Sequence, residues 1–139
     1  MNTVGMIGIG LMGQGIARNV LKHGFPLAIL DHPGNQPTGD LVEGGAKVYQ
    51  TPAALAAESE TIILCVTGAP QVEAVLTGPN GVLEKLKPGT VIIDCSTSLP
   101  RTSERMAEVV AAKGGTFIDA AMTRLPKHAQ EGTLNLLVG

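Results

Sequence analysis

Aromatic side chains are scarce in this 139-residue chain, which contains one Tyr, two Phe and no Trp. Hydrophobic residues still make up 44% of it, so the core has to be built from Val, Ile, Leu and Ala. Aliphatic cores of this kind are typical of parallel sheets that helices cover on both faces. The length is that of one domain able to bury its own core, and we expect residues 1–139 to form a single domain.

Positive charge is also scarce. Ten Lys and Arg against twelve Asp and Glu give a net charge of −2, which argues against a nucleic-acid partner. No apolar run approaches the roughly 18 residues of a membrane span, and no basic segment precedes the first apolar run as in a signal peptide. We therefore expect neither nucleic acid nor membrane as a partner, and a cytoplasmic location.

Cysteine is nearly absent, with Cys65 and Cys95 as the two examples. Each lies within or at the end of an apolar run, and the two are not arranged as a metal-ligand set. We interpret both as reduced core thiols, as in a cytoplasmic protein, and predict no metal site.

What the chain does have is a glycine turn between an aliphatic run and a helical pattern. The turn reads Gly-x-Gly-x-x-Gly at Gly8, Gly10 and Gly13, in the context that a dinucleotide-binding fingerprint requires. The first glycine permits the tight turn, the second lets the backbone approach a pyrophosphate, and the third allows close packing of helix on strand. The pyrophosphate would lie at the helix N-terminus, where unpaired N–H groups favour an anion.

A carboxylate completes this signature. The apolar run 27–30 ends in Asp31, 18 residues after Gly13, close to the expected spacing of roughly 20. Asp31 can accept hydrogen bonds from the ribose hydroxyls and would repel a 2′-phosphate, so we expect NAD rather than NADP. The alternative is a coincidental glycine turn with Asp31 as a helix cap. His32 beside it is interpreted as an exposed loop residue.

The remaining sequence alternates aliphatic runs with helical stretches, which predicts an α/β, doubly wound, mostly parallel sheet. The expected strands cover residues 3–8, 27–30, 46–49, 61–66, 91–94, 116–120 and 134–138. The expected helices cover residues 11–23, 40–44, 52–58, 71–76, 82–86 and 100–113.

Four stretches carry a family resemblance that spans essentially the whole chain. They are the glycine turn with Ala17-Arg-Asn19, the turn Cys65-Val-Thr67, the element Asp94-Cys-Ser-Thr-Ser-Leu-Pro100, and the segment Phe117–Gly139. Together they resemble the N-terminal domain of the β-hydroxyacid dehydrogenases, which include 3-hydroxyisobutyrate dehydrogenase, tartronate semialdehyde reductase and sulfolactaldehyde reductases. The resemblance implies a Rossmann-type NAD-binding domain, with the family's all-helical C-terminal domain outside this chain.

The resemblance also implies roles for particular residues. Those that would cradle the pyrophosphate are Gly8, Gly10, Leu11, Met12 and Gly13, and Asp31 would hold the ribose. Val66 and Thr67 would pack against the adenosine side, with Thr67 standing where the family usually has a proline. Thr97 would lie near the nicotinamide, and Ser96 and Thr123 would offer hydroxyls to the substrate. Alternatively, Ser96 or Thr97 caps the following helix, and Met12 is core filler.

Two departures from the family pattern concern the substrate and the chemistry. Arg124 stands where a glycine is usual beside the substrate, and a guanidinium fork suits a carboxylate, sulfonate or phosphate. We therefore expect a substrate with an extra or stronger anionic group; the alternative is a surface arginine without a ligand. The family's catalytic lysine has no counterpart here and is expected beyond Gly139, so the chain alone should bind NAD without turning over a substrate.

Three functions follow from these patterns. The first is the NAD-binding half of an oxidoreductase that transfers a hydride between a nicotinamide cofactor and a β-hydroxy acid or its semialdehyde. That enzyme would be a homo-oligomer at full length. The second is a stand-alone, non-catalytic nucleotide-binding module. A methyltransferase is disfavoured, because Gly13, the long helix after it and the element from Asp94 to Pro100 belong to the dinucleotide pattern.

Overall fold

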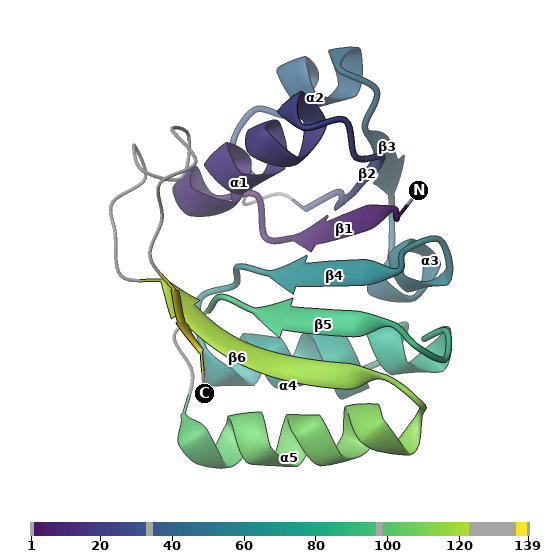
Figure 1. Cartoon of the computed structure of the whole chain (residues 1–139), viewed down its shortest axis with the longest axis vertical. Helices are drawn as coiled ribbons and strands as arrows, with labels where there is room; N and C mark the ends of the chain where they lie inside the picture. The colour runs from purple at the N-terminus through teal and green to yellow at the C-terminus, as the bar shows by residue number, and fades with distance from the viewer. Residues whose placement is uncertain (1, 33–34, 97–98, 123–135, 139) are drawn as a thin grey trace.

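The fold is built on one sheet of seven strands, in the part of the chain that the computed structural model describes: residues 2–32, 35–96, 99–122 and 136–138. The strand order is β3-β2-β1-β4-β5-β6-β7 (Figure 1). The strands are β1 (Val4–Ile7), β2 (Leu27–Leu30), β3 (Lys47–Tyr49), β4 (Thr61–Leu64), β5 (Val91–Asp94), β6 (Thr116–Met122) and β7 (Leu136–Val138). The first six run parallel, and β7 pairs antiparallel with β6. The expected doubly wound, mostly parallel sheet is confirmed.

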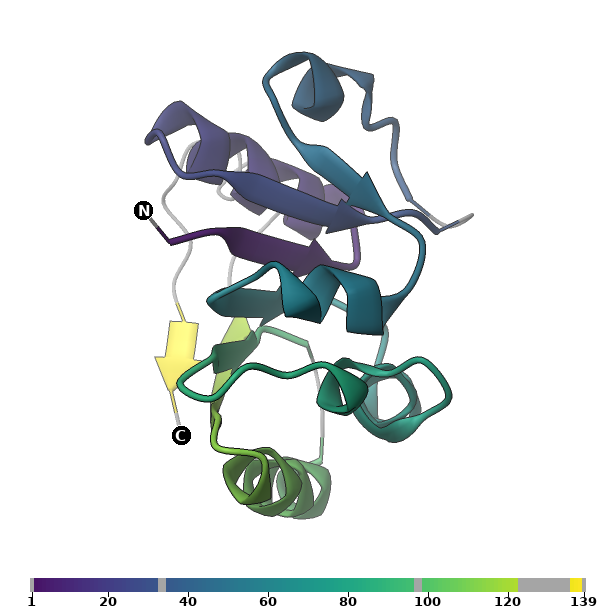
Figure 2. The same cartoon turned by 90° about the vertical axis from the view of Figure 1, so that its right-hand side faces the viewer.

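Helices cover both faces of this sheet. They are α1 (Leu11–Lys22), α2 (Gly39–Glu43), α3 (Pro52–Ala57), α4 (Ala69–Thr77) and α5 (Pro100–Ala112), with a 3₁₀ turn at Val82–Glu84. Figure 2 shows α1 and α5 on opposite sides with the strands between them. None of the described helices has the length and apolar character needed to cross a bilayer.

Two aliphatic cores fill the space between helices and sheet. On one face, Ala17 of α1 and Leu41 of α2 pack with Met6 and Ile29. On the other face, helices α3, α4 and α5 pack on Ile7, Ile62, Leu64 and Ile92. All four residues of β1 and of β2 are buried, which explains why these strands read as uninterrupted apolar runs.

The observed elements match the expected ones with four informative differences. The expected helix over 82–86 is a 3₁₀ turn at Val82–Glu84. Strand β4 ends at Leu64, two residues early, because the Val66 N–H donates to a side chain instead of to a neighbouring strand. Helix α4 begins at Ala69 instead of residue 71, since Pro70 is well tolerated in a first helical turn. Strand β6 extends to Met122, where β7 pairs with it.

A core substitution on β4 tests its central position. Ile62 is fully buried and β4 is paired on both sides, with β1 and with β5. We expect Ile62→Ala to lower the free energy of unfolding by about 2–5 kcal/mol, since it removes buried apolar contacts and leaves a cavity. Urea denaturation measures this change.

The matched control is Val48→Ala on edge strand β3, where the side chain is 43% exposed. That change should cost about 0.5 kcal/mol or less. Equal losses for the two variants would contradict the central position of β4.

Candidate functional site

The candidate site lies where the chain order of the sheet reverses. Strand β1 has β2 on one side and β4 on the other, and open α/β sheets bind ligands at the carboxyl ends of the strands beside such a point. A cleft of about 380 Å³ lies there, lined by the ends of β1, β2 and β4 and by α4. Its walls are mostly apolar, with Leu30, Val66 and Val75 among the lining residues.

The three glycines of the turn meet different surroundings. Gly8 has a φ of +101°, and a side chain there would collide with the Cys65 carbonyl at the end of β4. A side chain at Gly13 would collide with the Gly8 carbonyl, while a methyl group at Gly10 would meet nothing within 4 Å. The fold therefore requires glycine at the first and third positions. The bare backbone at Gly10 leaves open space beside the cleft, which fits a bound pyrophosphate.

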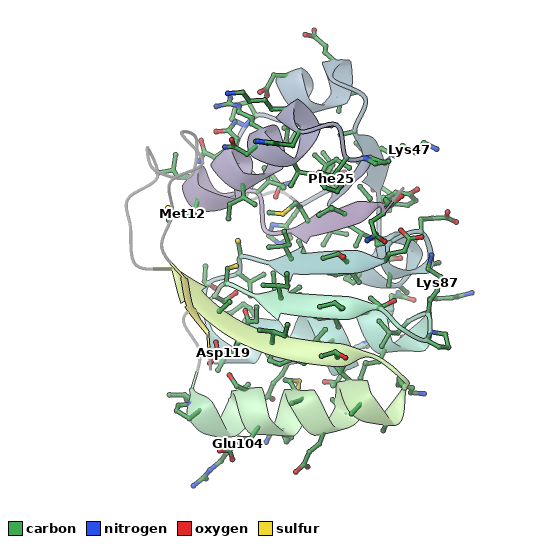
Figure 3. The ribbon with its side chains drawn as sticks, in the orientation of Figure 1. Met12, Phe25, Lys47, Lys87, Glu104 and Asp119 are labelled. Carbon is green, nitrogen blue, oxygen red and sulfur yellow. The ribbon has the colours of Figure 1, made fainter. Side chains whose placement is uncertain are left out.

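Helix α1 begins at this open position. Gly10 is its N-cap residue, and no side chain caps the helix, so its first backbone N–H groups remain available to an anion. No acidic residue lies in the first turn. Leu11 is 56% exposed, and Met12 lies at the start of the helix (Figure 3). The expected residues of the glycine turn thus surround one helix N-terminus.

Asp31 follows β2 directly, as the fingerprint requires. Its side chain is exposed, and its backbone N–H donates to the Tyr49 carbonyl at 2.9 Å. It does not cap a helix, because α2 starts later with Thr38 at the N-cap. His32 is exposed, as expected, and lines the cleft. The carboxylate therefore lies next to a cleft-lining residue at the end of β2.

Sequence reasoning missed a polar residue that closes the cleft on this side. Asn35 donates from Nδ2 to the Leu30 carbonyl at 2.9 Å and accepts from the Ile9 N–H at 3.4 Å. Gln36 donates its backbone N–H to the Ile9 carbonyl at 2.6 Å. These bonds fold the loop after β2 onto the glycine turn. An Asn within a Gly- and Pro-rich loop carries no signal that would have singled it out.

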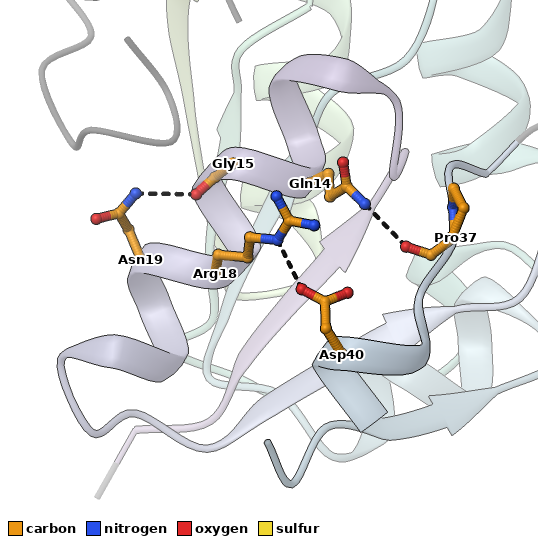
Figure 4. A network of polar contacts seen from close by, with 6 residues as sticks. All are labelled: Gln14, Gly15, Arg18, Asn19, Pro37 and Asp40. Carbon is orange, nitrogen blue, oxygen red and sulfur yellow. Dashed lines mark hydrogen bonds and ion pairs between the residues drawn. The ribbon is translucent and has the colours of Figure 1, made fainter. Parts of the chain in front are cut away.

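Helix α1 is tied to the same loop and to helix α2, which follows it. Gln14 Nε2 donates to the Pro37 carbonyl at 2.8 Å, and Arg18 Nε donates to Asp40 at 2.6 Å (Figure 4). The Arg18 hydrogen bond lowers the pKa of the exposed Asp40 carboxyl below its usual range. The turn, the loop and α1 therefore form one connected wall.

The far wall is the end of β4 with its neighbour β5. Val66 and Thr67, which the resemblance places against the adenosine, line the cleft. The Ser96 hydroxyl accepts the Val66 N–H at 2.9 Å, and the Ser96 side chain is buried. Ser96 does not cap α5, whose N-cap position is Leu99. Thr97, Thr123 and Arg124 lie outside the described residues.

Two thiols lie side by side beneath this wall. Cys65 and Cys95 follow paired residues of β4 and β5, and both are free. Their hydrogen bond to each other, together with burial, raises the pKa of the Cys65 thiol. Cys65 also lines the cleft.

Comparison with known proteins agrees with this geometry. The family profile described as the NAD-binding domain of 6-phosphogluconate dehydrogenase matches residues 3–139. The chain belongs to this family. Its relatives identify it as the NAD-binding domain of the β-hydroxyacid dehydrogenases, the family that the sequence resembles.

Several relatives are dehydrogenases, and these are longer than this chain. Mitochondrial 3-hydroxyisobutyrate dehydrogenase of Mus musculus is 36% identical over 137 residues, which cover 98% of this chain and 40% of the mouse enzyme. The crystal structure of 3-hydroxyisobutyrate dehydrogenase from Salmonella typhimurium matches with a TM-score of 0.91 and 26% identity, over 99% of this chain and 48% of that one. The structure of Psf3 with NADP⁺ and 2-OPP matches with a TM-score of 0.85 and 29% identity, over 97% and 48%. This chain thus spans less than half the length of these three proteins.

A buried carboxyl beside the site makes stability depend on pH. Asp94 on β5 is fully buried, and burial raises its pKa from the ordinary value of 3.8, with repulsion from Asp119 on the paired strand adding to the shift. The protonated carboxyl therefore favours the fold fully below about pH 4, and this contribution is lost as the pH rises through the folded-state pKa. We expect the wild type to lose stability relative to Asp94→Asn as the pH rises above about 4, with the free energy of unfolding measured by urea denaturation.

The control for this prediction is Glu104→Gln on the exposed face of α5 (Figure 3). It should leave the pH dependence close to that of the wild type. If the free energy of unfolding depends on pH in the same way for the wild type and Asp94→Asn, burial of the ionised Asp94 carboxylate does not destabilise the fold, and the prediction is wrong.

Proposed function

We propose that this domain binds NAD as the cofactor half of an oxidoreductase acting on a β-hydroxy acid or its semialdehyde. The observation that carries the proposal is the contrast within the glycine turn. Gly8 and Gly13 are crowded by the chain itself, whereas Gly10 faces open space at the N-terminus of α1. The fold does not require a glycine at position 10. Its presence at a helix N-terminus beside an apolar cleft therefore supports a dinucleotide site.

Each part of the cofactor has a matching part of the site. The pyrophosphate would lie over Gly10 against the N–H groups of Leu11 and Met12. The adenosine would occupy the apolar cleft lined by Leu30 and Val66. Bound NAD would supply the acceptor or donor of the hydride, and the protein would hold it in place at the carboxyl edge of the sheet.

Asp31 supports NAD over NADP. This exposed residue directly follows β2, where its carboxylate would accept hydrogen bonds from ribose hydroxyls and repel a 2′-phosphate. Since Psf3 was solved with NADP⁺, this preference needs a test of its own.

Calorimetric titration of the chain with NADH and with NADPH provides that test. We expect NADH to bind at least about tenfold more tightly, a difference of about 1.4 kcal/mol. Asp31→Asn should weaken the binding of NADH and so reduce the ratio of the two affinities. Tighter binding of NADPH by the wild type would overturn the role of Asp31, and binding of neither would overturn a cofactor site carried by this chain alone.

Gly10→Ala separates the site from the fold within the same titration. The methyl group has room, so the free energy of unfolding should change by about 1 kcal/mol or less, while NADH binding should weaken at least about tenfold. Gly13→Ala is the matched control: its methyl group would collide with the Gly8 carbonyl, so it should destabilise the fold by about 1–3 kcal/mol. Unchanged NADH binding by Gly10→Ala would contradict the placement of the pyrophosphate.

For the substrate, we propose an acid with an extra anionic group. Support comes from the sequence. Arg124 follows Thr123, whose hydroxyl is expected to contact the substrate, and the planar guanidinium of Arg124 suits a carboxylate, sulfonate or phosphate. In the catalytically active protein that carries this domain, Arg124→Ala should raise KM for an anionic substrate at least about tenfold, on the scale of a lost charge-assisted hydrogen bond. An unchanged KM would make Arg124 a surface residue.

Homo-oligomerisation of the complete enzyme and a cytoplasmic location remain predictions from the sequence. The mouse relative carries a mitochondrial name, so the compartment is not common to all members.

A further inference from the structure

The turn after β4 contributes a wall of the nucleotide cleft, yet it lies beyond the end of the strand. Strand β4 ends at Leu64, and Val66 and Thr67 of the turn line the cleft. The backbone N–H of Val66 therefore needs an acceptor from outside the sheet. That acceptor is the Ser96 hydroxyl, 2.9 Å away and 30 residues later in the chain.

Ser96 is itself fixed on several sides. Its backbone N–H donates to Asp94 Oδ1 at 2.9 Å, and its hydroxyl donates to the Leu64 carbonyl, with 3.4 Å between the two oxygens. The preceding N–H, that of Cys95, also donates to the Leu64 carbonyl, at 2.8 Å. Only 3% of Ser96 is exposed. The hydroxyl is thus held between the ends of β5 and β4, with its lone pair toward Val66.

We infer that Ser96 is a positioning residue of the nucleotide site, which holds the Val66–Thr67 turn against the bound cofactor and does not contact the substrate. This inference rests on the proposed binding of NAD. The hydroxyl donates to one backbone group and accepts from another, and it is buried at the base of the cleft wall. Without it, the Val66 N–H would lose its partner and the turn would lose its link to β5.

The experiment compares NADH binding by the wild-type chain with binding by Ser96→Ala. We expect the dissociation constant for NADH to rise roughly tenfold, the scale of one lost buried hydrogen bond. Amide hydrogen exchange at Val66 should become faster in the same variant, since its acceptor is gone. ADP-ribose should lose affinity by a similar factor, because the turn lines the adenosine side of the site.

Ser59→Ala is the matched control for a purely structural effect. Ser59 is also fully buried, and its hydroxyl donates to the Leu55 carbonyl at 2.7 Å. It precedes β4 at the opposite edge of the sheet from the cleft. This variant should lose stability as Ser96→Ala does, and should bind NADH as the wild type does. Ser96→Thr keeps the hydroxyl and should bind within about threefold of the wild type.

The outcomes separate this inference from the proposed function. A wild-type chain that binds no NADH overturns the NAD site itself. A wild type that binds NADH, with Ser96→Ala binding equally well, overturns the positioning role and leaves Ser96 available to the substrate. Equal weakening by Ser59→Ala and Ser96→Ala also overturns it, because the effect would then follow overall stability. If Ser96→Ala does not fold, Ser96→Cys gives the same comparison, since sulfur is a weak acceptor of similar position.

Discussion

The close approach of bare backbone between β1, β4 and α1 is the constraint on which the rest of this domain depends. A Cβ at Gly8 would overlap the Cys65 carbonyl oxygen, and a Cβ at Gly13 would overlap the Gly8 carbonyl oxygen. This contact brings the N-terminus of α1 down to the carboxyl edge of the sheet. It also places the end of β4 beside the turn, so that two strands and one helix terminus share a single cleft. Gly10, between the two crowded glycines, has no atom within 4 Å of an added Cβ and faces this cleft.

The aliphatic cores on the two faces of the sheet keep this arrangement rigid. Strand β1 is buried on both faces, and its neighbour β4 buries Ile62 and Leu64 under α3, α4 and α5. Interiors of this kind are close-packed and transmit small displacements. A cleft at the end of such strands therefore has walls whose positions are set by the core and not by the loops alone.

Much of the fold could be predicted from the sequence, because the relevant signals are local. The apolar run Leu27–Leu30 predicts a strand, and the glycine turn predicts a strand followed by a helix. The structure has a strand over Leu27–Leu30 and a helix that begins at Leu11, as predicted. The finer arrangement was not accessible in this way. The partner of Ser96 lies across 30 residues, and the antiparallel pairing of β7 with β6 depends on tertiary structure. The resemblance predicts a substrate contact for Ser96, and only the structure reveals that its hydroxyl accepts the Val66 N–H.

The bonds between α1 and the loop after β2 have an entropic consequence for ligand binding. Asn35 holds the loop to the glycine turn, and Gln14 holds it to α1 (Figure 4). A loop that is already anchored loses little conformational freedom when a nucleotide arrives, so less of the contact energy is spent on ordering it. The part of the loop from Asn35 to Pro37 is in this sense preorganised for the proposed ligand.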